Sequence, residues 1–175
     1  MDKKKAQYFA RLSGGSLGRA CSWAELEKDD AKLHQTAISL VKELADSEYT
    51  DALVLADKFL KASRETGKLW SKLSPKISTS DITRKARKTY IEIIISALSD
   101  CLALKTGAGK KIINFEIEKE LKKMSERWTA EELCSRISAA FWTLQTVDWS
   151  VNEKLIYHQL LLKILNSAKM EVLQY

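Results

Sequence analysis

The stretch YIEIIISALSDCLALK, residues 90–105, decides the fold of this chain of 175 residues. Its apolar residues fall on more than one side of a helix and do not alternate as in a half-buried strand. A helix that is apolar on several sides is packed by several neighbours, so we expect a central helix over residues 81–105. No other segment resembles a convincing strand, so the neighbours must be helices too. The sequence therefore predicts an all-α helical bundle.

Further helices are predicted by apolar residues that recur every three or four positions. They cover residues 4–12, 16–28, 32–47, 50–67, 115–126, 130–147 and 151–170. Two capping boxes, Thr129 with Glu132 and Ser150 with Glu153, begin the last two helices. The stretch 67–80 contains the only proline, and we predict that it is the main connection, with room for a short helical turn.

The composition indicates a soluble, folded protein, because 45% of the residues are hydrophobic and 30% are charged. No apolar run approaches the ~20 residues that cross a bilayer, and no apolar segment of a secretory signal follows the N-terminal lysines. The 3 cysteines form no C-x-x-C pair, so we expect neither a disulfide framework nor a zinc site. A reducing cytoplasm fits this cysteine usage best.

The sequence contains no recognisable catalytic motif. His34 and His158 are far apart with no ligand at motif spacing, and we expect both to be structural. The glycine-containing loop KTGAGKK, residues 105–111, lacks the spacing of a phosphate-binding loop. We therefore expect no catalytic activity, no metal and no bound cofactor in this chain alone.

The net charge of +6 is compatible with an acidic partner. Four basic residues gather near the start of the central helix: Arg84, Lys85, Arg87 and Lys88. They form either a solvated helix end or a patch that contacts nucleic-acid phosphates. No aromatic residues interleave with them to stack on bases, which favours the solvated end.

The 5 tryptophans leave a similar choice. We favour packing in the core and between helices. The alternative is that some lie at a subunit interface, where tryptophan is enriched.

Near the N-terminus, the stretch ARLSGGSLGRACSW, residues 10–23, ends one helix and begins another. Gly14 and Gly15 end the first helix and allow a tight reversal. Ser16 can cap the second helix by accepting a backbone N–H with its hydroxyl.

Two residues of the second helix suggest an anion site. Gly18 lets a backbone or phosphate come close, and Arg19 projects from the first turn beside free N–H groups. The alternative is a structural corner in which Arg19 pairs with a local carboxylate such as Glu25 or Asp29.

These residues resemble a known family. The run RLSGGSLGRA, residues 11–20, resembles the sensor-2 segment in the lid of clamp-loader ATPases of the AAA+ class. Its Gly-Arg-Ala form is similar to the delta-prime subunits of bacterial DNA polymerase III. Residues 95–107 resemble the collar helix of that family, and residues 128–165 resemble its last two helices. The sequence departs from the family at residues 21–23, where a Leu-Glu-Leu-like run is usual.

The resemblance implies a C-terminal piece of a longer subunit. Residues 1–28 would end an AAA+ lid, and residues 29–175 would form the all-helical collar through which clamp-loader subunits assemble. The partners would be the other clamp-loader subunits, with the sliding clamp and primed DNA reached through the full complex, and no membrane. Enzyme activity would belong to that complex, a DNA-directed DNA polymerase (a nucleotidyltransferase) with a clamp-loader ATPase.

In ATP-binding relatives the sensor-2 arginine touches the nucleotide phosphates. This role maps onto Arg19, with Gly18 and Ser16 beside it. In a delta-prime-like subunit the resemblance leaves two alternatives: a working phosphate contact or a vestigial one. ATP would then be a ligand of the full-length protein only.

Two alternatives stay open. The first is a stand-alone helical nucleic-acid-binding domain that uses residues 84–88. The second is the collar of another AAA+ protein such as gamma/tau, which typically has Arg-Asp-Ala in place of Gly-Arg-Ala.

Overall fold

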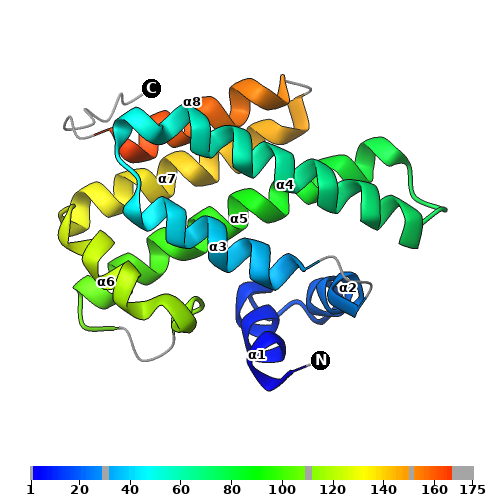
Figure 1. The fold of residues 1–175 in the computed structure, drawn as a ribbon, viewed down its shortest axis with the longest axis horizontal. Helices are drawn as coiled ribbons and strands as arrows, with labels where there is room; N and C mark the ends of the chain where they lie inside the picture. The colour runs from blue at the N-terminus through cyan, green and yellow to red at the C-terminus, as the bar shows by residue number, and fades with distance from the viewer. Residues whose placement is uncertain (1, 29–31, 109–111, 150–151, 167–175) are drawn as a thin grey trace.

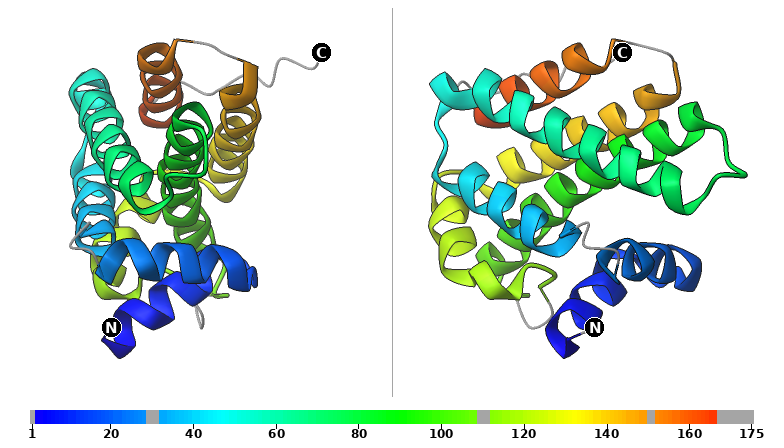
Figure 2. Two further views of the ribbon diagram at one scale, coloured as in Figure 1. Left: turned by 90° about the vertical axis from the view of Figure 1, so that its right-hand side faces the viewer. Right: turned by 45° about the vertical axis from the view of Figure 1, so that its right-hand side comes forward.

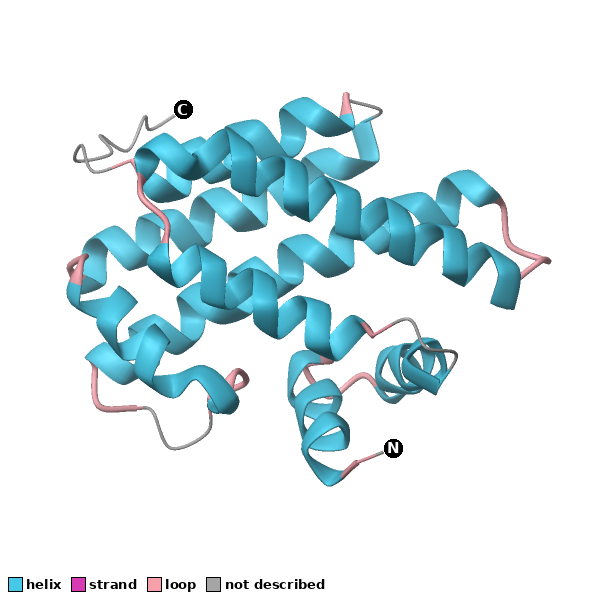
Figure 3. Ribbon diagram, in the orientation of Figure 1, coloured by secondary structure: helices cyan, strands magenta, loops and turns pink. Residues whose placement is uncertain are grey.

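The computed structural model describes residues 2–28, 32–108, 112–149 and 152–166, and every regular element in these ranges is a helix (Figures 1 and 3). The α-helices are α1 (Lys3–Leu12), α2 (Leu17–Lys28), α3 (Leu33–Asp46), α4 (Ala52–Leu73), α5 (Thr79–Lys105), α6 (Glu118–Glu126), α7 (Ala130–Thr146) and α8 (Glu153–Leu165). The short 3-10 turns are η1 (Tyr49–Asp51), η3 (Phe115–Ile117) and η4 (Val147–Trp149). The predicted all-α bundle is confirmed.

Helix α5 runs through the middle of the bundle and packs against α3, α4, α6 and α7 (Figure 1). The consecutive residues Ile93, Ile94 and Ile95 are all buried. Successive side chains of a helix point in different directions, so such a run needs neighbours on several sides. The predicted central helix is therefore confirmed. Neither α5 nor any other described helix is long and apolar enough to cross a membrane.

Helices α4 and α5 form a long antiparallel hairpin that extends to the right in Figure 1. The predicted connection at residues 67–80 is wrong in its first part, because α4 continues through Gly67 to Leu73. A Cβ at Gly67 would lie 3.6 Å from Ala86 Cβ and 3.8 Å from Thr83 Cα of α5. The glycine therefore marks a close contact between two helices and not a helix end.

The last two helices begin at side-chain caps. Thr129 Oγ1 accepts the N–H of Glu132 at 3.1 Å, and the Glu132 carboxylate accepts the N–H of Thr129 at 2.8 Å, so the first predicted capping box is confirmed. Helix α8 is capped by Asn152, whose Oδ1 accepts the N–H of Lys154 at 2.9 Å. The predicted cap, Ser150, lies outside the described residues.

Helices α1 and α2 lie at one end of the bundle, below α3 in Figure 1 and in both views of Figure 2. The reversal between them uses Gly14 and Gly15, whose φ angles of 59° and 89° suit glycine best. Tyr8, Phe9 and Trp23 of these helices belong to the same hydrophobic core as the rest of the chain. The division into lid and collar stays a prediction.

Candidate functional site

The corner between α1 and α2 places Arg19 against α5. Ser16 Oγ accepts the N–H of Arg19 at a long 3.4 Å, as predicted for the cap. The guanidinium lies over the ring of Trp23, 4.9 Å from its centroid, and its Nη2 forms an ion pair with Glu92 of α5. At Gly18 an added Cβ would meet nothing within 4 Å, so this side of the corner is open.

The ion pair between Arg19 and Glu92 is partly buried, with the two side chains 39% and 22% exposed. Burial raises the pKa of Glu92, and the Arg19 guanidinium opposes that rise. The carboxylate that pairs with Arg19 is therefore distant in sequence. The alternative of a local partner had named Glu25 and Asp29, and Asp29 lies outside the described residues. A nucleotide phosphate would have to compete with Glu92 for this arginine, and the sensor-2 role stays a prediction.

The basic run at the start of α5 is engaged by acidic side chains and one aromatic ring. The contacts are Arg84 with Asp81 (3.2 Å) and Asp148 (3.7 Å), Lys88 with Asp148 (2.7 Å), Arg87 with Glu153 (2.7 Å), and Lys85 with the centroid of the Trp70 ring (4.2 Å). Burial, reinforced by the nearby Arg19, lowers the pKa of Lys85. Carboxylates therefore offset much of the charge of the run, and this packing does not favour a contact with DNA phosphates.

The five tryptophans divide between core and surface. Trp23, Trp70 and Trp128 are buried. Trp142 and Trp149 are 51% and 65% exposed, and their rings pack edge to face with centroids 6.2 Å apart. Packing in the core thus describes the first three, whereas the last two are available to a partner.

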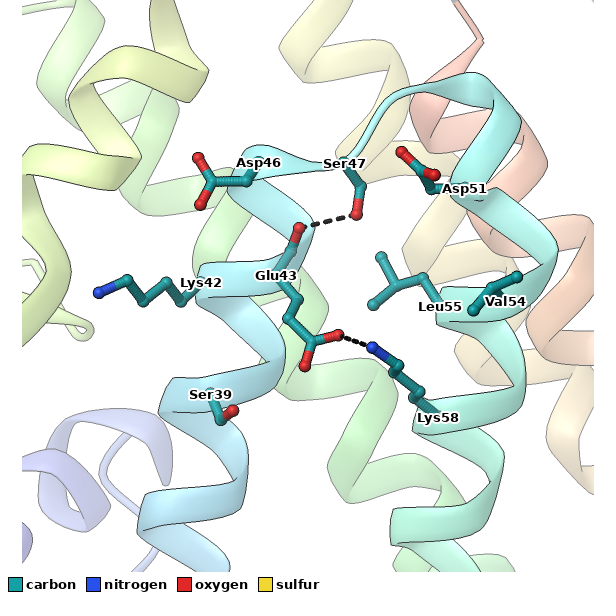
Figure 4. Close-up of a pocket in the computed structure, with 9 residues that line it drawn as sticks. All are labelled: Ser39, Lys42, Glu43, Asp46, Ser47, Asp51, Val54, Leu55 and Lys58. Carbon is teal, nitrogen blue, oxygen red and sulfur yellow. Dashed lines mark hydrogen bonds and ion pairs between the residues drawn. The ribbon is translucent and has the colours of Figure 1, made fainter.

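A hollow of about 470 Å³ lies between α3 and α4 near η1 (Figure 4). Lys58 Nζ of α4 donates to Glu43 Oε2 of α3 at 2.6 Å, and Ser47 Oγ donates to the backbone carbonyl of Glu43 at 2.7 Å. Val54 and Leu55 supply its apolar lining. Of the other charged groups that line it, Lys42 pairs with Glu120 at 3.0 Å and Asp46 pairs with Lys123 at 3.5 Å, so the hollow brings together no arrangement suited to catalysis.

The two histidines each join helices. His34 packs edge-on against Tyr8, with ring centroids 4.9 Å apart, and its Nε2 lies 3.1 Å from Glu116 Oε1. His158 Nε2 lies 2.9 Å from Asp57 Oδ1, and this hydrogen bond is the main cause that lowers the pKa of Asp57. Across the described ranges no group of three or more His, Cys, Asp or Glu side chains is placed to hold a metal ion.

Arg136 has a role that the sequence pattern did not reveal. Its side chain is buried, with Nε donating to the carbonyl of Ile164 at 2.8 Å and Nη2 donating to that of Asn166 at 2.6 Å. The guanidinium also lies over Trp128, 4.5 Å from the ring centroid. It therefore satisfies carbonyls at the end of α8 and ties α8 to α7. One signal was available: this arginine is the only charged residue within 133–147.

Comparison with known proteins supplies the family. A family model for the C-terminal region of the DNA polymerase III delta subunit matches residues 54–166, which is more than half of the chain. No curated protein and no solved structure matches. The matched segment runs from the first turn of α4 through α8, whereas the corner with Arg19 precedes it. The chain therefore belongs to the family defined by the C-terminal region of DNA polymerase III delta subunits.

Proposed function

We propose that this chain is the collar-type C-terminal region of a bacterial clamp-loader subunit, and that it helps to assemble the complex that loads the sliding clamp onto primed DNA. The family match over residues 54–166 carries the proposal, because those residues build most of the bundle. The partners are the other clamp-loader subunits, with clamp and DNA reached through the complete complex in the cytoplasm. An all-helical domain with two exposed tryptophans suits assembly, because tryptophan is enriched at protein interfaces.

Association with the other subunits tests this role. The chain should co-elute with a mixture of clamp-loader subunits in size-exclusion chromatography. It should bind primed DNA only weakly when alone. Tight, salt-dependent DNA binding by the isolated chain, without co-elution, would instead favour the stand-alone nucleic-acid-binding alternative.

The identity of the subunit depends on residues outside the matched segment. The matching family model is that of the delta subunit. The Gly-Arg-Ala at residues 18–20 instead resembles delta-prime, and it differs from the Arg-Asp-Ala that is typical of gamma/tau. We therefore propose a delta-prime-like subunit. Subunit mixtures that lack either delta or delta-prime provide the test, because the intact protein should complete only the mixture without delta-prime. Completion of the mixture without delta would replace this assignment.

A contact between Arg19 and a nucleotide phosphate can be tested separately. The Arg19 guanidinium already pairs with Glu92, so a phosphate would have to compete with that carboxylate. If a phosphate competes with Glu92, Arg19→Ala should weaken ATP binding to the intact subunit several-fold. Glu92→Gln should strengthen it, since the arginine is released. Calorimetric titration of both variants measures the effect. Equal affinity in all three proteins would leave Arg19 with a structural role only.

A further inference from the structure

The outward face of α7 carries a continuous row of uncharged side chains. We name this row the α7 stripe, and it consists of Cys134, Ser138, Phe141, Trp142, Gln145 and Trp149, all of them exposed. The spacing places them along one side of the helix and its η4 extension. In Figure 2 (left) α7 lies at the edge of the bundle, on the side opposite α3.

The absence of charge on the α7 stripe contrasts with the outward face of most of α4. From Asp57 onward, helix α4 presents charged residues to solvent on each turn, including Lys58, Lys61, Glu65 and Lys68, whereas its first turn exposes Leu53 and Val54. On α7 the only charged residue between Glu132 and Asp148 is Arg136, and that side chain is buried. An outward helix face in a soluble protein is normally charged or polar, so the α7 stripe has the composition of a face that is covered.

Three aromatic residues give the α7 stripe its apolar area. Phe141, Trp142 and Trp149 are 49%, 51% and 65% exposed. Half-exposed aromatic side chains of this kind amount to roughly 300 Å² of surface in total, which is the size of a functional patch on a monomer. A standard interface buries about 800 Å² per partner, so the stripe is suited to be the apolar centre of an interface and not the whole of it.

The shape and charge of the stripe indicate the kind of partner. It is one helix wide and roughly 20 Å long, which fits the apolar face of one amphipathic helix of about four turns. On its α8 side, Lys163 Nζ lies 5.2 Å from the centroid of the Trp142 ring and has no acidic partner among the described residues. A partner helix with an acidic edge would complement this lysine, whereas Asp148, the acid that a second copy would bring beside Trp149, already pairs with Arg84 and Lys88.

We propose that the α7 stripe docks an amphipathic helix of another clamp-loader subunit, with an acidic residue of that helix beside Lys163. This inference rests on the proposed assembly function and identifies the surface that performs it. Trp142 and Trp149 already pack edge to face before the partner binds. Binding therefore costs little of the conformational entropy of these two side chains.

The test compares two variants of the full chain. The double variant Trp142→Glu with Trp149→Glu places charge on the stripe, whereas Leu73→Glu places charge on an apolar side chain that is 42% exposed at the far end of α4. Binding to the other purified clamp-loader subunits is measured by calorimetry. We expect the double variant to bind at least tenfold more weakly and the Leu73→Glu control to stay within twofold of wild type. Thermal melts should show that both variants fold.

Two further readouts make the proposal specific. Acrylamide quenching of tryptophan fluorescence should fall when the partner subunits bind, because Trp142 and Trp149 are the exposed tryptophans. Lys163→Glu should weaken binding several-fold, and Lys163→Arg should not.

The outcomes separate this inference from the function on which it rests. If wild type binds no clamp-loader subunit, the proposed function fails and the docking proposal fails with it. If wild type binds and the double variant binds equally well, the function stands and the α7 stripe is excluded as the interface. A wild-type dimer that the double variant abolishes, with partner binding unchanged, would assign the stripe to a second copy and overturn the proposal.

Discussion

The contact of Arg19 with Glu92 fixes the start of α2 on α5, and its two members lie in different environments. Glu92 is the more buried of the two, whereas Arg19 keeps more contact with solvent and stacks on Trp23. Sequence reasoning singled out Arg19 but not its partner, because the two residues are 73 positions apart. Only tertiary packing brings them together, and no local pattern encodes such a pair.

Removal of either partner should therefore have unequal effects on the free energy of unfolding. Arg19→Ala leaves a mostly buried carboxylate without its cation and loses the stacking on Trp23, so we expect a cost of about 1–3 kcal/mol. Glu92→Gln keeps the shape and an acceptor oxygen for an arginine that water reaches, so we expect less than about 1 kcal/mol. Urea denaturation measures both. A larger cost for Glu92→Gln would contradict this ranking.

The same carboxyl predicts a pH dependence. Burial raises the pKa of Glu92 above its ordinary 4.5, so the folded chain binds this proton more tightly than the unfolded chain. Between the ordinary and the raised value the unfolded state holds fewer protons, and the contribution of this group to stability falls as pH rises. The Glu92→Gln variant lacks the proton, so its stability relative to wild type should improve from about pH 4 towards neutrality. Denaturation at several pH values measures this difference, and a change in the opposite direction would show that Arg19 outweighs burial.

At the scale of elements, most helices could be predicted from apolar periodicity and caps, because both signals are local. The end of α4 could not, since Gly67 and the following residues look like a connection in sequence. A glycine inside a helix and a glycine that ends a helix look alike in sequence and differ in what packs against them. At Gly67 the packing element is α5.

This packing predicts opposite results for two substitutions at Gly67. A Cβ at this position would meet α5 at ordinary contact distances, so Gly67→Ala should stabilise the chain by about 0.5–1 kcal/mol through helix propensity. Gly67→Val adds two methyl groups against Ala86 and should cost about 1–3 kcal/mol through overpacking. Thermal denaturation of the pair provides the measurement. Destabilisation by Gly67→Ala would mean that α4 and α5 pack too closely for a Cβ at residue 67.

Arg136 predicts a second effect on elements, because it holds the end of α8. Arg136→Met keeps much of the apolar stem but leaves the carbonyls of Ile164 and Asn166 without this donor, at a cost of about 2–3 kcal/mol. Arg136→Lys should be intermediate, since a single ammonium cannot reproduce the planar fork. Hydrogen exchange should quicken selectively at the end of α8. Unchanged exchange in the methionine variant would show that α8 is held by its apolar packing alone.

At the scale of the whole molecule, the sequence predicts the helical class and the central α5 but not which surfaces remain free. Helix α7 has apolar residues on both sides, so periodicity alone could not show that Ala140 faces the core while Phe141 and Trp142 face solvent. The sequence pattern also did not predict how the loop before α6 is held against α5. Asn114 Nδ2 donates to Asp100 Oδ2 at 2.7 Å, a contact between groups that only the folded chain brings together.

The cysteines of this bundle offer a consequence for experiment. Cys101 is buried, its thiol donates to the carbonyl of Leu121, and burial raises its pKa to about 12, whereas Cys21 and Cys134 are exposed. Alkylation of the native chain should therefore add two groups and alkylation of the unfolded chain three, as intact mass would show. After Cys21→Ser, a fluorophore or spin label would attach at Cys134 alone, and this native handle at the start of α7 would report directly on what approaches that helix.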